Sequence, residues 1–182
     1  MECSSVNYLV LVNKTHAIPS DWDERIHLVP VNDRNGQRFL LEEKTAEAFE
    51  SLRTAMEKQG LIIEIVSGYR SRKDQEETIR EIAAEEGLEA AMKRCAKPGF
   101  SEHETGLALD VSYDLIFGEL LMRWNPVFAE YGFIHRYPKG KEDLTGYPEE
   151  NWHLRYVGTE HSRMIEAKSL TLEEYLTKRH IP

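Results

Sequence analysis

The chain has 182 residues, of which 41% are apolar and 30% are charged, and its formal net charge is −9. This length and composition are typical of one folded domain with a hydrophobic core. The acidic balance argues against a nucleic-acid partner, which needs a basic surface to neutralise phosphates, and against binding to an anionic membrane surface.

The cysteine content and the N-terminal segment bear on the cellular compartment. Cys3 and Cys95 are the two cysteines, and we expect both to be reduced thiols, because Cys3 lies in a segment expected to be loose and the two could pair only if the fold brought them together. The early apolar run Tyr8 to Val12 has five residues, whereas a signal peptide needs about 7–15 and a membrane span about 20. We therefore expect a cytoplasmic protein, or a protein of the cell envelope if an N-terminal anchor was trimmed. The oligomeric state is left open.

The first half of the chain predicts an irregular segment followed by helices and one strand. Residues 1–38 are punctuated by prolines and polar turn residues, so we expect a largely irregular segment with one short strand at Tyr8 to Val12. Apolar residues at three- and four-residue intervals predict a helix from Leu41 to Lys58. The β-branched run Leu61 to Val66 predicts a buried strand. Two further helices are expected, from Ser71, with Asp74 as its capping partner, to about Glu86, and from Leu88 to Ala96.

The segment Gly106 to Ser112 alternates as a strand does. Leu107, Leu109 and Val111 are expected on one face, and Gly106, Ala108 and Asp110 on the other. The face that carries the carboxylate is therefore lined by small side chains, which leaves room for a metal ion and a ligand.

The remaining pattern completes one α+β domain spanning residues 1–182. The expected elements are a helix from Glu119 to Tyr131, a strand from Phe133 to Tyr137, a loop from Lys139 to Glu149, a strand from Asn151 to Val157 and a helix from Leu172 to Lys178. Thr171 and Glu174 form a capping box for the last helix.

Two separated stretches hold side chains suited to a catalytic metal site. His103 and Asp110 lie in the first stretch, and Glu150 and His153 lie in the second. A catalytic zinc site needs three protein ligands and one open position for water, which two imidazoles and one carboxylate provide. Zinc lowers the pKa of its water from 15.7 to about 7, and a nearby carboxylate such as Glu150 can then accept the proton.

The spacing of these residues resembles a known signature. Ser101-x-His103-x-x-Gly106-x-Ala108-x-Asp110 followed by Glu150-x-x-His153 resembles the VanY/VanX-type D-alanyl-D-alanine peptidases, close to the bifunctional VanXY type. Those are zinc enzymes that cut the D-Ala-D-Ala terminus of peptidoglycan precursors. Other blocks match in the same order: Leu11 to Lys14, Ser67 to Ser71 with Gln75, Tyr131 to Phe133, and Trp152 to Tyr156.

The resemblance implies a role for each matching residue. His103, Asp110 and His153 match the zinc ligands, and Glu150 matches the general base. Arg70 matches the residue that stabilises the oxyanion, a duty that suits a permanently charged guanidinium. The resemblance also implies residues that seat or wall the substrate, namely Tyr69, Gln75, Ser101 and Trp152. It implies a small antiparallel sheet that carries the zinc site and packs with helices, as in hedgehog-like folds.

Plainer interpretations remain for several of these residues. Arg70 could lie on the surface, Glu150 could belong to a solvated acidic turn, and Trp152 could be a core aromatic. Glu102 and Glu104 flank a ligand and are expected to be solvated. The other histidines lack ligand spacing and are expected to be structural or exposed: His16, His27, His135, His161 and His180. Cys95 has no histidine pattern near it, which argues against a cysteine protease.

Three functions follow as hypotheses. The first is a zinc D,D-carboxypeptidase, D-Ala-D-Ala dipeptidase or both, acting on peptidoglycan-derived peptides. The second is an L,D-carboxypeptidase or endopeptidase that uses the same zinc site, with selectivity set by the loops at Leu115 to Pro126 and Lys139 to Glu149. The third is a non-catalytic zinc-stabilised binding module, which would need neither Glu150 nor Arg70.

Overall fold

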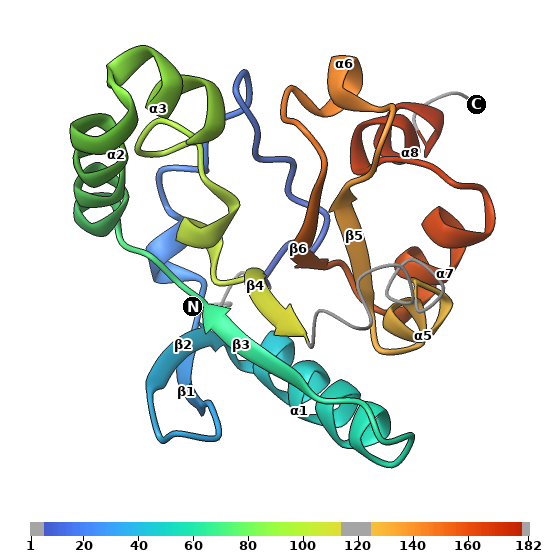
Figure 1. Cartoon of the computed structure of the whole chain (residues 1–182). Helices are drawn as coiled ribbons and strands as arrows, with labels where there is room; N and C mark the ends of the chain where they lie inside the picture. Colours follow the sequence, from blue (N-terminus) through green and yellow to red (C-terminus); the bar gives the residue numbers. More distant parts are fainter. Residues whose placement is uncertain (1–5, 114–124, 180–182) are drawn as a thin grey trace.

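The computed structural model describes residues 6–113 and 125–179. Figure 1 labels the α-helices and the β-strands. Together with two short 3-10 helices, η1 and η2, they follow in this order: η1 (Trp22–Glu24), β1 (Leu28–Asn32), β2 (Arg38–Glu42), α1 (Glu43–Glu57), β3 (Ile63–Ser67), α2 (Arg72–Glu86), α3 (Leu88–Arg94), η2 (Glu102–Thr105), β4 (Ala108–Tyr113), α5 (Asn125–Glu130), β5 (Phe133–Tyr137), α6 (Glu142–Thr145), β6 (Glu150–Tyr156), α7 (Thr159–Ala167) and α8 (Leu172–Arg179). The predicted α+β class is confirmed.

The main sheet is antiparallel and has the strand order β3-β4-β6-β5, while β1 and β2 form a separate antiparallel pair. The strands β4 and β6 occupy the middle of the main sheet, so side chains on them are flanked on both sides. Asp110 on β4 pairs with His153 on β6. A register shift between Ile65 and Ser67 on β3 lets Ser67 pair with Asp110 as well. The sheet therefore carries two of the candidate metal ligands at its centre.

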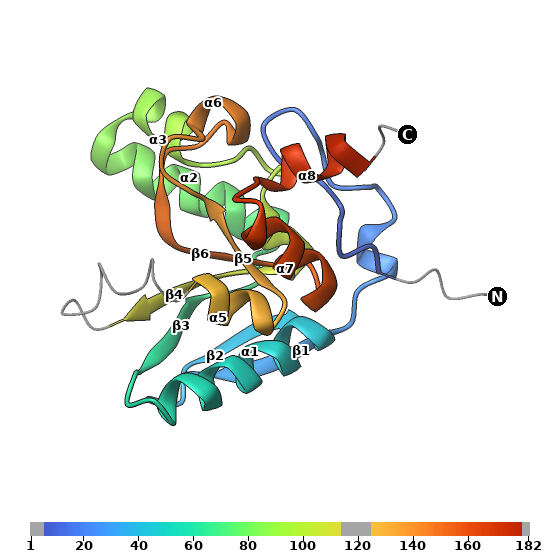
Figure 2. The same cartoon turned by 90° about the vertical axis from the view of Figure 1, so that its right-hand side faces the viewer.

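The largest apolar cluster lies between α1 and the sheet. Phe49, Leu52 and Met56 recur at helical spacing on α1 and are buried against residues such as Ile65 and Leu109. Figures 1 and 2 both show α1 on the side of the strands away from α3, while α7 packs beside β5. Burial of these side chains, at about 25 cal/mol per Å² of apolar area, fixes the sheet on which the site is built.

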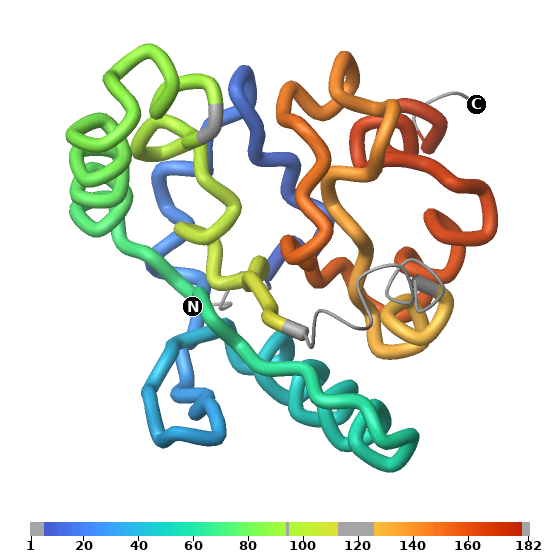
Figure 3. Tube along the Cα trace, viewed as in Figure 1, coloured from blue at the N-terminus to red at the C-terminus, as the bar shows by residue number. Residues whose placement is uncertain are grey.

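The N-terminal segment departs from the prediction. Tyr8 to Val12 is not a strand, and β1 at Leu28–Asn32 is a strand where none was predicted. The carbonyls of Tyr8 and Val10 accept hydrogen bonds from the Arg155 side chain, so they do not join a strand ladder. Figure 3 shows this segment in blue as an irregular path. Its apolar residues form a second cluster, made of Val10, Val12, Ile18 and Trp22 with Leu107.

Other boundaries shift for local reasons. Leu107 packs in that second cluster and not beside Leu109 and Val111, because Gly106 adopts a left-handed φ of +72° just before β4 begins. The predicted loop Lys139 to Glu149 contains the short helix α6. The strand β2 and the helix α7 were not predicted.

The remaining expectations match or fall outside the described residues. Ser71 and Asp74 cap α2, and Thr171 and Glu174 cap α8, as predicted. Cys3 and His180 lie outside the described residues, as do residues 119–124 of the predicted helix Glu119 to Tyr131 and residues 115–124 of the loop Leu115 to Pro126. Within residues 6–113 and 125–179, no helix has the length and apolar character to cross a membrane.

Candidate active site

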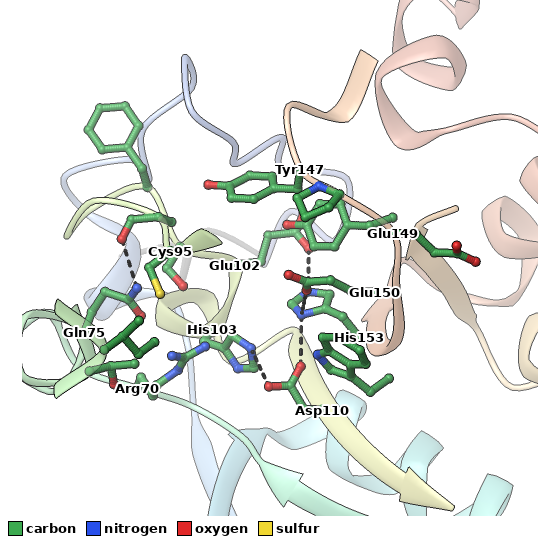
Figure 4. Close-up of a pocket in the computed structure, with 18 residues that line it drawn as sticks. Arg70, Gln75, Cys95, Glu102, His103, Asp110, Tyr147, Glu149, Glu150 and His153 are labelled. Carbon is green, nitrogen blue, oxygen red and sulfur yellow. Dashed lines mark hydrogen bonds and ion pairs between the residues drawn. The ribbon is translucent and has the colours of Figure 1, made fainter. Parts of the chain in front are cut away.

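The site begins with the pairing of two central strands. Asp110 and His153 are cross-strand partners, and Asp110 Oδ1 lies 3.1 Å from His153 Nδ1. Directly opposed residues in an antiparallel pair have Cβ atoms about 4.5–5.5 Å apart, close enough for short side chains to meet. The register of the sheet therefore places the carboxylate against the imidazole, as Figure 4 shows.

The third candidate ligand, His103, reaches the same point from η2. Its Nε2 lies 3.3 Å from Asp110 Oδ2. Its Nδ1 lies 2.8 Å from the carbonyl oxygen of Gly68, which can only accept, so Nδ1 carries the proton and Nε2 faces Asp110 with its lone pair. A Cβ on Gly68 would lie 2.6 Å from the carbonyl oxygen of Leu40, so the position requires glycine. The close approach of β2 thus fixes the carbonyl that orients His103.

The three side chains fit a zinc ion. One ligand atom from each of His103, Asp110 and His153 can be chosen so that all lie within 4.8 Å of one another. Ligands about 2.0–2.2 Å from a tetrahedral zinc lie about 3.3–3.6 Å apart. The two distances from Asp110 oxygens to imidazole nitrogens are 3.3 and 3.1 Å. The set is therefore a candidate site for a divalent cation, with imidazole and carboxylate donors of the kind that suits zinc.

Charge and burial act differently on the two imidazoles. Burial lowers the pKa of His103, which favours the neutral ring that a metal ligand requires. Burial also disfavours the charged form of His153, but hydrogen bonds with Asp110 and Glu102 outweigh it and raise the pKa of His153 to about 9. The surroundings of His153 therefore favour positive charge at this point.

Glu102 was expected to be solvated, and that prediction is wrong. Its side chain is 1% exposed and accepts hydrogen bonds from Arg136 and Arg155. Burial opposes its ionisation, but the two guanidinium charges outweigh burial and hold the pKa of this carboxyl well below its usual range. Glu104 is also buried, and its carboxylate accepts from the backbone N–H of Gly99.

The candidate ligands open into a pocket of about 260 Å³. Glu150 and Arg70 both line it, on either side of the ligands (Figure 4). Glu150 Oε2 lies 3.8 Å from His153 Nδ1, and the Glu150 backbone carbonyl lies 2.8 Å from His135 Nε2. Arg70 Nε is buried with no hydrogen-bond partner, so this donor is left for a group that enters the pocket.

The residues predicted to hold substrate separate into two groups. Gln75, Ser101 and Trp152 line the pocket, whereas Tyr69 is not among the lining residues. Gln75 is 2% exposed, donates to the Ala96 carbonyl and leaves Oε1 without a partner. Trp152 is 44% exposed, so it is a wall of the pocket and not a core aromatic.

Sequence reasoning missed several other lining residues, among them Cys95, Tyr137 and Tyr147. Tyr147 is 5% exposed, and its buried hydroxyl has no hydrogen-bond partner. A tyrosine beside Pro148 in a polar loop was the signal for it in the sequence. His135 was expected to be structural or exposed, and it is structural: it supports the backbone at Glu150.

The chain is similar to known carboxypeptidases in sequence. Residues 38–159 match the family model of VanY, described as D-alanyl-D-alanine carboxypeptidase. The chain is 38% identical over 186 residues to the putative carboxypeptidase YodJ of Bacillus subtilis, which covers 94% of this chain and 68% of that protein. It is also 38% identical over 188 residues to the bifunctional D-Ala-D-Ala dipeptidase and carboxypeptidase VanXYC of Enterococcus gallinarum. That match covers 93% of this chain and 94% of VanXYC.

Solved structures agree in fold. The vancomycin resistance D,D-pentapeptidase VanY in complex with Zn(II) superposes with a TM-score of 0.79 at 33% identity, over 94% of this chain and 99% of that one. The LD-carboxypeptidase LdcB superposes with a TM-score of 0.80 at 36% identity, over 96% of this chain and 89% of LdcB. The expected antiparallel sheet with packed helices is confirmed.

Proposed function

Because this chain belongs to the VanY family of D-alanyl-D-alanine carboxypeptidases, we propose that it is a zinc peptidase that removes the C-terminal D-alanine of peptidoglycan precursor peptides. Splitting of the free dipeptide D-Ala-D-Ala belongs to the same proposal, since the similar VanXYC carries both activities in its name. One observation carries it: His103, Asp110 and His153 converge in a pocket that Glu150 and Arg70 also line.

His103, Asp110 and His153 are the residues that would hold the zinc. A bound zinc ion acts as a Lewis acid and lowers the pKa of a water molecule to about 7. The Gly68 carbonyl, 2.8 Å from His103 Nδ1, orients the first imidazole from the side away from Asp110. Such partners of ligating histidines fix the tautomer and the direction of the ring.

Glu150 supplies the general base in this proposal. It accepts a proton from the attacking water and donates it to the departing amino group, so that the C–N bond breaks and free D-alanine leaves. Its position on β6, three residues before His153, keeps its carboxylate beside the ligands. This residue is the one whose loss should affect the chemical step most.

Arg70 and the polar pocket residues bind the substrate in this proposal. The unpartnered Nε–H of Arg70 donates to the carbonyl oxygen as it gains negative charge. Ser101 and Gln75 line the same pocket and seat the terminal carboxylate through donors, the Ser101 hydroxyl and the second N–H of the Gln75 amide, whose first N–H donates to the Ala96 carbonyl. Such donors act in a partly buried setting, where a charge-assisted hydrogen bond is stronger than in water.

A second candidate activity has a specific observation in its favour. The LD-carboxypeptidase LdcB is as similar to this chain in structure as the D,D-pentapeptidase. The metal ligands do not discriminate between the two activities, because both need the same activated water. A non-catalytic zinc module is disfavoured, since a structural zinc requires neither Arg70 nor Glu150 in the pocket.

A substrate panel tests the proposal. The purified zinc-loaded protein is incubated with D-Ala-D-Ala, with a pentapeptide ending in D-Ala-D-Ala, and with a tetrapeptide ending in an L,D-linked D-alanine. Release of alanine is measured for each substrate. We expect the fastest release from one of the two D,D-linked substrates. Faster release from the tetrapeptide would assign the L,D activity, and no release by folded, zinc-loaded protein would refute a peptidase.

A further inference from the structure

A buried ionic cluster lies behind the candidate metal site. It consists of Glu102, Arg136, Arg155 and Glu173, and its two positive and two negative side chains balance in charge. The side chains of Arg136 and Arg155 are both 0% exposed. Burial of unpaired charge is costly, so such a cluster persists only when every member is paired. The cluster lies next to His153, so these ion pairs can hold a side chain against a candidate metal ligand.

The two carboxylate oxygens of Glu102 have different partners. Oε1 accepts from Arg136 Nε at 2.8 Å and from Arg155 Nη1 at 2.7 Å. Oε2 lies 3.4 Å from His153 Nε2. One oxygen therefore anchors the carboxylate to both arginines, and the other is directed at the imidazole.

The two arginines are themselves held by distant segments. Arg136 donates to the Glu173 carboxylate on α8 at 3.0 and 2.6 Å. Arg155 donates to the backbone carbonyls of Tyr8 and Val10 in the N-terminal segment. With both guanidinium groups fixed, the Glu102 carboxylate has no freedom to turn away from His153.

We propose that Glu102 is a positioning residue that keeps the Nε2 proton on His153 and directs Nδ1 at the metal. The inference rests on the proposed role of His153 as a zinc ligand. Nδ1, which lies 3.1 Å from Asp110 Oδ1, would present its lone pair to a zinc ion bound between these two side chains. The nitrogen that keeps its proton is then Nε2, and the Glu102 carboxylate beside it can only accept. The N-terminal segment and α8 thus stabilise the tautomer of a metal ligand through the arginines.

The tautomer can be measured directly in the zinc-loaded wild-type protein. Long-range ¹H–¹⁵N NMR identifies which ring nitrogen of His153 carries a proton, with a His153→Ala variant used only to assign the signal. We expect the proton on Nε2. A proton on Nδ1 would overturn the inference, and the result does not depend on whether any variant at Glu102 folds.

Zinc affinity tests the contribution of Glu102. In Glu102→Gln the side-chain NH2 replaces one of the two carboxylate oxygens. Whichever way the amide turns, its NH2 faces another donor, either the arginine N–H groups or His153 Nε2–H. Loss of an outer-shell partner typically costs 10–100-fold in metal affinity. We expect the zinc Kd, measured by competition with a chelator, to rise by about that factor. Glu104→Gln is the matched control, because Glu104 is a buried acid on the same turn whose carboxylate contacts Arg72 and the backbone N–H groups of Gly99 and Ser101 and no candidate ligand.

The outcomes separate this inference from the proposed function. Wild-type zinc affinity in folded Glu102→Gln would overturn the positioning role and leave the peptidase proposal intact. An equal loss in Glu104→Gln would assign the effect to the packing of η2 and also overturn it. A wild-type protein that binds no zinc would refute the proposed function and, with it, this inference.

Discussion

Asp110 on β4 and His153 on β6 are paired across the centre of the sheet, and their side chains meet at 3.1 Å. The backbone register alone brings a carboxylate and an imidazole from residues 43 positions apart to one point. Zinc would therefore join two central strands to η2, which carries His103. Metal binding and fold stability are linked through this arrangement.

Zinc removal should destabilise the protein reversibly. A ligand present at about 1,000 times its Kd stabilises the folded state by about 4 kcal/mol. We expect a chelator to lower the Tm and added zinc to restore it. In Asp110→Asn the neutral amide weakens zinc binding, so most of the zinc-dependent rise in Tm should disappear. An undiminished rise in that variant would exclude Asp110 as a ligand.

Glu150→Ala should separate metal binding from catalysis. The carboxylate is predicted to move the proton and not to hold the metal, so the zinc content should stay at the wild-type value. Loss of a general base typically costs about 10²–10⁴-fold in rate. We expect kcat for alanine release to fall by that factor. Unchanged turnover would assign the base to another residue.

Arg70→Ala should lower kcat more than it raises KM. Removal of one oxyanion donor costs about 10²–10³-fold in kcat in other hydrolases. Arg70→Lys is the control, because it keeps the charge but loses the planar fork of donors and should recover only part of the rate. A change confined to KM would show that Arg70 binds substrate without acting on the transition state.

Gly68→Ala should damage both stability and zinc affinity. The new Cβ would lie 2.6 Å from the backbone carbonyl oxygen of Leu40, so the backbone at position 68 would have to shift. The Gly68 carbonyl that contacts His103 Nδ1 would shift with it. Overpacking of this kind costs about 1–3 kcal/mol. The control is Ser67→Ala, the preceding position, where we expect a change within about 0.5 kcal/mol. Chemical denaturation and chelator competition measure the two effects, and a wild-type zinc Kd would separate Gly68 from the orientation of His103.

The capping box of α2 should give a small, pH-dependent stability effect. Ser71→Ala removes the cap and should lower the free energy of unfolding by about 1 kcal/mol.

Hydrogen bonds from the Ser71 hydroxyl and N–H lower the pKa of Asp74. Its contribution is therefore present above the unfolded pKa of about 3.9 and is lost as pH falls through the lower folded value. Denaturation at pH 7 and pH 3 should show the difference between wild type and Asp74→Asn shrinking in acid, and a constant difference would refute this account.

Local pattern determined a large part of this protein. The helices α1, α2 and α8, the strands β3, β4, β5 and β6, and both capping boxes follow from periodicity and turn residues within a few positions. The resemblance to the VanY/VanX-type signature, carried by His103, Asp110, Glu150 and His153, identified the side chains that meet in the pocket. The catalytic roles of Glu150 and Arg70 stay predictions. The helices, strands and caps could be predicted because they depend on neighbours in the chain, whereas the meeting of the two stretches was implied by the family resemblance.

Only the tertiary structure decided the rest. Glu102 looks like a surface residue in the sequence because its partners, Arg136, His153 and Arg155, lie 34, 51 and 53 positions away. Tyr8 to Val12 looks like a strand in the sequence because it is a short apolar run, but its Tyr8 and Val10 carbonyls accept hydrogen bonds from the Arg155 side chain. Burial and charge pairing over such separations depend on how the chain is packed, and no local pattern encodes them.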